Sequence, residues 1–359
     1  MPDVNPVLSA LEAWLRARLP QAQNVGVVEL QRPGTGASSE TRLFDVHWNE
    51  AGNPRSVPVV LRAAPSRPGV FPTYDLGFQF RIMQSLHDHT GVPVPKVLWL
   101  EEDPAIIGAP FFMMQRLEGD VPQDFPSYHT AGVYHDATPA MRRKMWWGCL
   151  DAMVKLHAVD WKHCGLEFVG VPTRGTDAVD RLLTHWESYL THWVKKEDPQ
   201  ESHPTMEAAL AWLKANRYEP ESVALNWGDA KLGNVLFSRP ERDVLALLDW
   251  EGACIADPEQ DLASLYFSDL RAHRGHGIAP LEGTPTAEEL IDRYEELSGR
   301  RVKHFLYNEV LATLWRGLVQ IRIMKDMRAT GMNIPAEMIR NNFPTQHLSK
   351  LLRLPPPGS

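Results

Sequence analysis

A short stretch at 226–237, with the sequence NWGDAKLGNVLF, combines residue types that could carry chemistry. Asp229 and Asn234 stand five residues apart in this glycine-containing loop, directly before an apolar run typical of a strand. Asp249 follows fifteen residues later, at the end of the run VLALLDW. A carboxylate can orient or deprotonate an attacking hydroxyl, and carboxylate and carboxamide oxygens are suitable ligands for Mg²⁺. Together the three residues indicate phosphoryl transfer.

The same residues also have a purely structural interpretation. Asp229 and Asn234 lie beside Gly228 and Gly233, so the pair could simply form turns, because Asp, Asn and Gly all favour turn conformations. An aspartate such as Asp249 commonly closes a strand. Each residue alone favours this interpretation, whereas the three at this spacing, with strand patterns on both sides, favour the chemical one.

The composition is that of a globular protein. The chain has 359 residues, 43% hydrophobic and 23% charged, which is enough for roughly two domains of ordinary size. The net charge of −8 is spread over the chain without a basic block, so we expect neither nucleic acid nor a membrane as partner. Three cysteines without a CxxC pair indicate neither a disulfide framework nor a zinc site. Without a signal-peptide pattern or a long apolar run, a cytoplasmic protein is expected.

Apolar periodicity predicts an α+β chain with a strand-rich front third and a helical remainder. The front third is expected to hold helices from Pro6 and over 75–89, and strands at 25–30, 41–48, 57–62, 94–100 and 110–116. The remainder is expected to hold helices over 139–158, 177–196, 202–216 and 303–330, and strands at 235–237 and 244–250. We therefore expect two units, 1–116 and 117–359, with a ligand cleft between them.

Longer segments around the polar loop resemble the sequence motifs of a known protein family. WGDAKLGNVLF followed by LLDWEGACIADPEQDLASL resembles the core of the aminoglycoside phosphotransferase (APH) family, with HGD-x-x-x-x-N, then DWE or DFE, then GDPxxDLA. The loop PGTGASSETRLF, the strand VVLR and the connection PFFMMQRLEG match in order. The resemblance covers roughly 25–267 and is nearest to the branch associated with acyl-CoA dehydrogenases. It implies a protein-kinase-like bilobal fold, with a small antiparallel sheet and one inserted helix in the N-lobe and a larger helical C-lobe.

The resemblance also implies roles for individual residues of the second unit. Asp229 is the expected catalytic base, and Asn234 and Asp249 are the expected Mg²⁺ ligands. Lys231 matches the lysine of the protein-kinase Asp-x-Lys arrangement and could neutralise the transferring phosphoryl group, the alternative being a solvated loop lysine. Asp261 is expected to brace the catalytic loop from a helix that Asp257 caps.

ATP would be bound by residues of the first unit. The resemblance implies that the phosphates are covered by the loop residues Gly34, Thr35, Gly36, Ser38 and Ser39. It implies that adenine meets backbone groups of the hinge residues Met114, Gln115 and Arg116. Protein kinases place a lysine on the third strand and pair it with a glutamate of the inserted helix. Here Arg62 and Gln79 stand at those positions, so the positive charge remains and the ion pair is lost.

The sequence therefore predicts an ATP- and Mg²⁺-dependent kinase that transfers the γ-phosphoryl group to a hydroxyl of a small molecule. The alternative is a nucleotide-binding pseudokinase or regulatory module with little or no transfer activity. This alternative is motivated by Arg62, Gln79 and Trp227, the last of which replaces the family's usual histidine before Gly-Asp. The sequence leaves the acceptor and the oligomeric state open.

Overall fold

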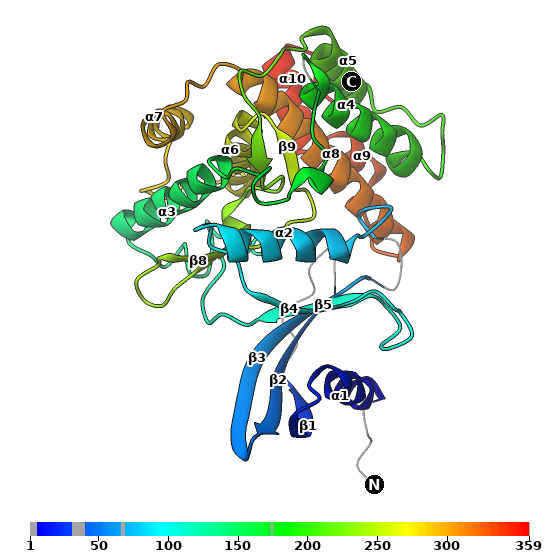
Figure 1. Ribbon diagram of the computed structural model, residues 1–359. Helices are drawn as coiled ribbons and strands as arrows, with labels where there is room; N and C mark the ends of the chain where they lie inside the picture. The colour runs from blue at the N-terminus through cyan, green and yellow to red at the C-terminus, as the bar shows by residue number, and fades with distance from the viewer. Residues whose placement is uncertain (1–5, 31–39, 66–68, 174, 359) are drawn as a thin grey trace. The chain divides into compact units, whose positions relative to one another are not determined.

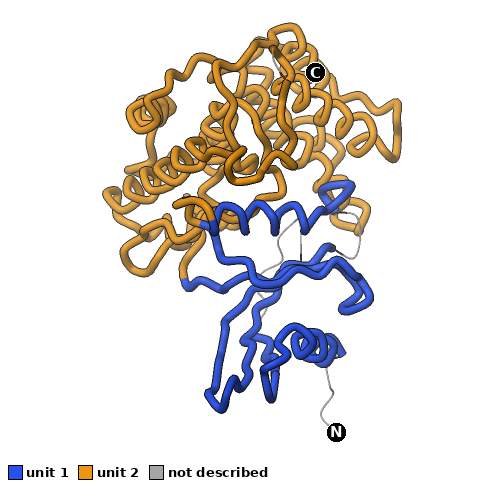
Figure 2. The backbone as a smooth tube through the Cα atoms, viewed as in Figure 1, with its two compact units in different colours: residues 1–88, 94–118 blue, residues 89–93, 119–359 orange. Residues whose placement is uncertain are grey.

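The computed structural model describes residues 6–30, 40–65, 69–173 and 175–358 of the chain (Figure 1). The chain divides into two compact units, shown in different colours in Figure 2. Unit 1 comprises residues 1–88 and 94–118, and unit 2 comprises 89–93 and 119–359. The expected boundary after Arg116 lies two residues before the end of unit 1.

Unit 1 is built on an antiparallel five-stranded sheet with the order β1-β2-β3-β5-β4. The strands are β1 Ala22–Glu29, β2 Glu40–Glu50, β3 Asn53–Ala63, β4 Val97–Glu101 and β5 Phe111–Gln115. The two-residue turn between β2 and β3 consists of Ala51 and Gly52, both with positive φ, as a tight hairpin requires. One helix is inserted between β3 and β4, which confirms the predicted N-lobe arrangement.

Two helices belong to this sheet unit. Helix α1, Pro6–Arg18, begins at the predicted proline and buries Leu11, Trp14 and Leu15 in the core of the sheet. Helix α2, Leu76–His89, is the inserted helix, and Asp75 caps it by accepting a hydrogen bond from the Phe78 N–H at 2.7 Å.

Unit 2 is mainly helical, as predicted. Its α-helices are α3 Pro139–His157, α4 Asp177–Tyr189, α5 Pro204–Ala215, α6 Glu259–His273, α7 Ala287–Ser298, α8 Phe305–Ala329, α9 Ala336–Arg340 and α10 Phe343–Leu352. A π-helical segment, Leu190–Val194, prolongs α4 to about its expected end. The long helix α8 packs against α5, α6 and α10. Among the described residues, no helix is both long and apolar enough to cross a membrane.

Two small two-stranded antiparallel sheets interrupt the helices of unit 2. Strand β6, Ala224–Asn226, pairs with β9, Cys254–Ala256, and β7, Val235–Phe237, pairs with β8, Val244–Leu247. The predicted strand over 244–250 thus ends at Leu247, three residues early. Its end is followed by Asp249, whose φ of +66° lies in the left-handed region and cannot continue an extended ladder.

Candidate active site

The loop between β6 and β7 carries three of the predicted site residues. Gly228 shapes its first half, because its φ of +86° suits glycine and a Cβ there would lie 1.8 Å from the carbonyl oxygen of Gly252. The second half is a single 3₁₀ turn, closed by a hydrogen bond from the Asn234 N–H to the Lys231 carbonyl oxygen at 3.0 Å. This backbone holds Asp229, Lys231 and Asn234 within one tight loop.

Asp249 lies beside this loop because its neighbour Leu248 is fixed on both sides. The Leu248 N–H donates to the Asn234 carbonyl oxygen at 2.8 Å, and the indole N–H of Trp227 donates to the Leu248 carbonyl oxygen at 2.7 Å. Trp227 is fully buried, as expected for an indole that replaces a scaffold histidine. The left-handed backbone of Asp249 is a strained conformation, of a kind that proteins retain mainly at functional positions.

Asp229 is held at both carboxylate oxygens. Its Oδ2 accepts a hydrogen bond from Asn234 Nδ2 at 2.9 Å, and its Oδ1 lies 2.8 Å from Nη2 of Arg316 on α8. Its side chain is 19% exposed, and burial acts to raise its pKa. The charges of Lys231 and Arg316 and the hydrogen bond from Asn234 outweigh burial, so the pKa of Asp229 lies below its ordinary value. Asp229 is therefore ionised at neutral pH.

Lys231 is committed to two carboxylates. Its Nζ donates to Asp124 Oδ2 at 2.8 Å and lies 3.7 Å from Asp229 Oδ2. Burial acts to lower the pKa of Lys231, but Asp229 and Asp124 together raise it above the ordinary value. The alternative of a solvated loop lysine is therefore wrong, since the side chain is 20% exposed and ion-paired.

Asn234 has one side-chain atom suited to a cation. The residue is buried, and its Nδ2 donates to both the carbonyl oxygen and the carboxylate of Asp229, at 3.0 and 2.9 Å. With the nitrogen used in this way, the carboxamide oxygen is the atom that could face a metal ion. In the part of the chain that the structure describes, no group of three His, Cys, Asp or Glu side chains could hold a metal by itself.

Helix α6 braces the catalytic loop, which confirms the prediction for Asp261. This fully buried carboxylate accepts hydrogen bonds from the Trp227 N–H at 2.6 Å and the Gly228 N–H at 2.9 Å. His157 contacts Asp261 Oδ2 at 3.2 Å and the Tyr294 hydroxyl at 2.8 Å. The buried His157, at the end of α3, thus ties α6 to α7.

Arg316 is the main residue of the site that sequence reasoning missed. Besides contacting Asp229, its Nη2 donates to the Ala230 carbonyl oxygen at 3.1 Å and to the Ser264 hydroxyl at 2.8 Å. It lies on α8, 86 residues beyond Ala230. The available indication was a single charge inside the otherwise apolar run VLATLWRGLV, where a buried arginine needs a partner.

The predicted nucleotide-binding residues lie in unit 1. Arg62 is on β3, opposite Phe112 of β5, and Gln79 is buried on α2. At the predicted hinge, the Gln115 N–H donates to the Lys96 carbonyl oxygen at 2.8 Å, and the Arg116 N–H donates to the Pro58 carbonyl oxygen at 3.0 Å. These two N–H groups are therefore not available to adenine, which leaves the other backbone groups of the hinge for the predicted contact. The predicted phosphate-covering residues Gly34, Thr35, Gly36, Ser38 and Ser39 lie outside the described residues.

A sequence profile described as the phosphotransferase enzyme family (APH) matches residues 31–300. The chain belongs to this phosphotransferase family. A Ralstonia eutropha protein solved as a candidate aminoglycoside phosphotransferase superposes with a TM-score of 0.64 at 22% identity, over 96% of this chain and 94% of that one. A thermostable mutant of aminoglycoside phosphotransferase APH(4)-Ia, in complex with AMP-PNP and hygromycin B, gives 0.54 at 16% identity, over 96% and 98%. The kinase-like fold predicted from the motifs is thereby confirmed.

Curated relatives of the phosphotransferase are named as acyl-CoA dehydrogenase family members. Member 10 of Mus musculus is 30% identical over 293 residues, and member 11 of Rattus norvegicus is 28% identical over 296. The matches cover 79% and 80% of this chain but 25% and 35% of those proteins. The chain therefore spans about a quarter to a third of the length of these relatives. Their names agree with the predicted branch, the one associated with acyl-CoA dehydrogenases.

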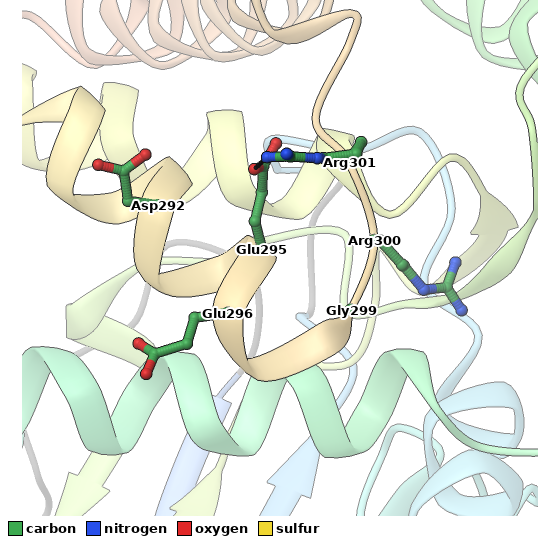
Figure 3. A pocket seen from close by; sticks show the side chains of 6 residues that line it. All are labelled: Asp292, Glu295, Glu296, Gly299, Arg300 and Arg301. Atoms are coloured by element: carbon green, nitrogen blue, oxygen red, sulfur yellow. Dashed lines mark hydrogen bonds and ion pairs between the residues drawn. The ribbon is translucent and has the colours of Figure 1, made fainter.

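Unit 2 of the phosphotransferase also has a surface hollow at the end of α7 (Figure 3). Its charged side chains are partly paired with one another, as Arg301 is with Glu295. Arg300 points away from the carboxylates in Figure 3 and donates to the Ser222 hydroxyl and the His157 carbonyl oxygen. None of the predicted site residues lines this hollow.

Proposed function

We propose that this phosphotransferase transfers the γ-phosphoryl group of ATP to a hydroxyl of a small molecule, with Asp229 as the base. The observation that supports this most is the pair of hydrogen bonds at Leu248, one from its N–H to Asn234 and one from the Trp227 indole to its carbonyl oxygen, which brings Asp249 next to the Asp229–Asn234 hydrogen bond. A further support is the solved neighbour that binds AMP-PNP and hygromycin B.

In the proposed reaction, the ionised Asp229 accepts a hydrogen bond from the acceptor hydroxyl and receives its proton as the new P–O bond forms and the bond from the γ-phosphorus to the bridging oxygen breaks, which releases ADP. The Asn234 carboxamide oxygen and the Asp249 carboxylate are oxygen donors of the type that Mg²⁺ prefers, and nucleotide oxygens would complete the set. Bound there, Mg²⁺ would neutralise phosphate charge. Lys231, held by Asp124 and Asp229, adds a fixed positive charge beside the base.

On the nucleotide side, we assign phosphate binding to Arg62 and to the loop 34–39, and adenine contact to the segment from Met114. Gln79 would hydrogen-bond where protein kinases form an ion pair. The competing function is a pseudokinase that binds nucleotide without transfer. One observation favours it: both oxygens of Asp229 already have partners, Arg316 and Asn234, so the acceptor must compete for a remaining lone pair.

A substitution of the base separates the two functions. Asp229→Asn is expected to retain the thermal stabilisation given by Mg·ATP. Its rate of ADP formation with a library of small hydroxyl compounds is expected to fall about a hundred- to ten-thousandfold. Asp243→Asn is the control, because this exposed carboxylate lies on the neighbouring β7–β8 hairpin. Equal turnover in Asp229→Asn and the native chain would disprove the assignment, and binding without turnover in the native chain would favour the pseudokinase.

A further inference from the structure

Arg271, on the last turn of α6, is a half-buried cation whose own partner is missing. Its guanidinium forms no hydrogen bond or ion pair with any residue that the structure describes. The other two cations near Asp229 are both committed, Lys231 to Asp124 and Arg316 to Asp229 and Ser264. Withdrawing a guanidinium from water costs free energy unless an anion compensates it. An uncommitted arginine at this position therefore needs an explanation.

The helix geometry places Arg271 on the face of α6 that Arg316 contacts. Ser264, which accepts a hydrogen bond from Arg316, is seven residues before Arg271, and residues at this spacing share one face of a helix. The chain around Asp124 meets the same end of α6, because the Ser127 hydroxyl donates to the Ala272 carbonyl oxygen. The positive charge of Arg271 also helps to lower the pKa of Asp124 and the pKa of Arg316.

The cations around the base differ in how they are paired. Lys231 and Arg316 pair with Asp124 and Asp229, and the buried Asp261 of α6 is bonded to backbone N–H groups of the loop. The guanidinium of Arg271 has no ion-paired carboxylate among the described residues. A guanidinium binds a carboxylate or a phosphate through two parallel N–H bonds, a geometry that an ammonium cannot reproduce.

The position of Arg271 assigns it to the acceptor rather than to the nucleotide. In phosphoryl transfer the attacking and leaving oxygens lie roughly in line, on opposite sides of the transferring group. Asn234, a proposed ligand of the metal that accompanies the nucleotide, binds Oδ2 of Asp229. Arg316 binds Oδ1, and Arg271 lies on the α6 face that Arg316 contacts through Ser264.

We propose that the acceptor carries an anionic group, a carboxylate or a phosphate monoester, in addition to its hydroxyl, and that Arg271 binds this group. The inference rests on the proposed function, since it names the acceptor class of the same site. It separates this chain from a kinase of polycationic aminoglycosides, whose positive charge the unpaired guanidinium of Arg271 would repel.

A binding experiment tests the anion site without requiring transfer. The full chain with Mg·AMP-PNP, which fills the triphosphate site, is titrated at constant ionic strength with acetate and with inorganic phosphate while its unfolding temperature is recorded. We expect at least one anion to stabilise the native chain, to stabilise the Arg271→Lys variant less because only the charge is retained, and to have no effect on Arg271→Gln. Arg274→Gln, an exposed arginine three residues away, is the matched control and should behave as native. The anion that raises the unfolding temperature more indicates whether the acceptor's anionic group is a carboxylate or a phosphate.

A transfer experiment tests the same residue by acceptor charge. Hydroxyl compounds of matched size bearing a carboxylate, a phosphate monoester, a neutral amide or a trimethylammonium group are compared by Mg·ATP-dependent ADP formation. An anionic member is expected to have a KM about ten- to a hundredfold lower than the neutral one, the scale of one charge-assisted hydrogen-bonded pair. Arg271→Gln should abolish this preference while kcat changes little, and Arg274→Gln should retain it.

The outcomes distinguish failure of the inference from failure of the proposed function. Preference for a neutral or cationic acceptor, or an anion response that persists in Arg271→Gln, would overturn the inference and leave phosphoryl transfer standing. Anion binding that depends on Arg271 without phosphorylation of any acceptor would support the anion site and count against the proposed transfer.

Discussion

At the scale of single residues, the ionisation of Asp229 depends on a contact that the motif does not contain. Arg316 binds the carboxylate at 2.8 Å and is one of the causes that lower its pKa against burial. Both residues are poorly accessible to solvent, so water screens their interaction weakly. In the proposed reaction Arg316 is therefore a positioning residue, since it fixes one carboxylate oxygen and favours the charged form that would accept a proton.

Removing this cation should raise the pKa of Asp229 and move the acid limb of the pH–rate profile to higher pH. We expect the shift in Arg316→Met, with partial recovery in Arg316→Lys, both in ADP formation and in the carbon-13 NMR titration of the Asp229 carboxyl. Arg322→Met is the control. It removes another buried arginine of α8, which pairs with Glu197 and Asp326, so it should lower stability without moving the acid limb. Equal shifts in both methionine variants would refute the positioning role.

At the scale of elements, the sequence predicts the loop well and its supports poorly. Asp229 and Asn234 are close in sequence, so their spacing already indicates a shared loop. Strands β6 and β9 have three residues each, too few for a period to be detected, yet they set the approach of Gly228 to Gly252. The contact of Arg316 likewise depends on how α8 packs against α6, which no local pattern specifies.

The close approach of these two loops can be tested with a single added methyl group. Gly228→Ala places a Cβ 1.8 Å from the Gly252 carbonyl oxygen and also strains a left-handed backbone, so it should cost roughly 3 kcal/mol or more of unfolding free energy. Gly277→Ala is the matched control, because its φ is +70° and nothing lies within 4 Å of its Cβ. It should cost only about 1 kcal/mol. Similar urea midpoints for the two variants would contradict the packing argument.

At the scale of the whole molecule, family and fold follow from the sequence, whereas charge placement follows only from the structure. The net charge of −8 suggests no particular acceptor, whereas the structure leaves the guanidinium of Arg271, close enough to affect Asp124 and Arg316, without an ion pair among the described residues.

A buried carboxyl group in unit 2, that of Glu259, affects the stability of the protein. Glu259, at the start of α6, accepts hydrogen bonds at 2.7 Å from the N–H groups of Lys303 and His304, and so ties α6 to the segment before α8.

This carboxyl should make the stability of the protein depend on pH. Burial raises the pKa of Glu259 to about 7 although the two N–H groups act to lower it, so the folded chain binds its proton more tightly than the unfolded chain does. The contribution is then fully present below the unfolded pKa, near 4.5, and is lost as the pH rises through about 7. The urea midpoint of native protein minus that of Glu259→Gln should therefore fall between pH 5 and pH 8. For Glu296→Gln, a largely exposed control, the same difference should stay constant. A constant difference for Glu259→Gln would mean that the two backbone bonds keep the carboxylate charged throughout this range.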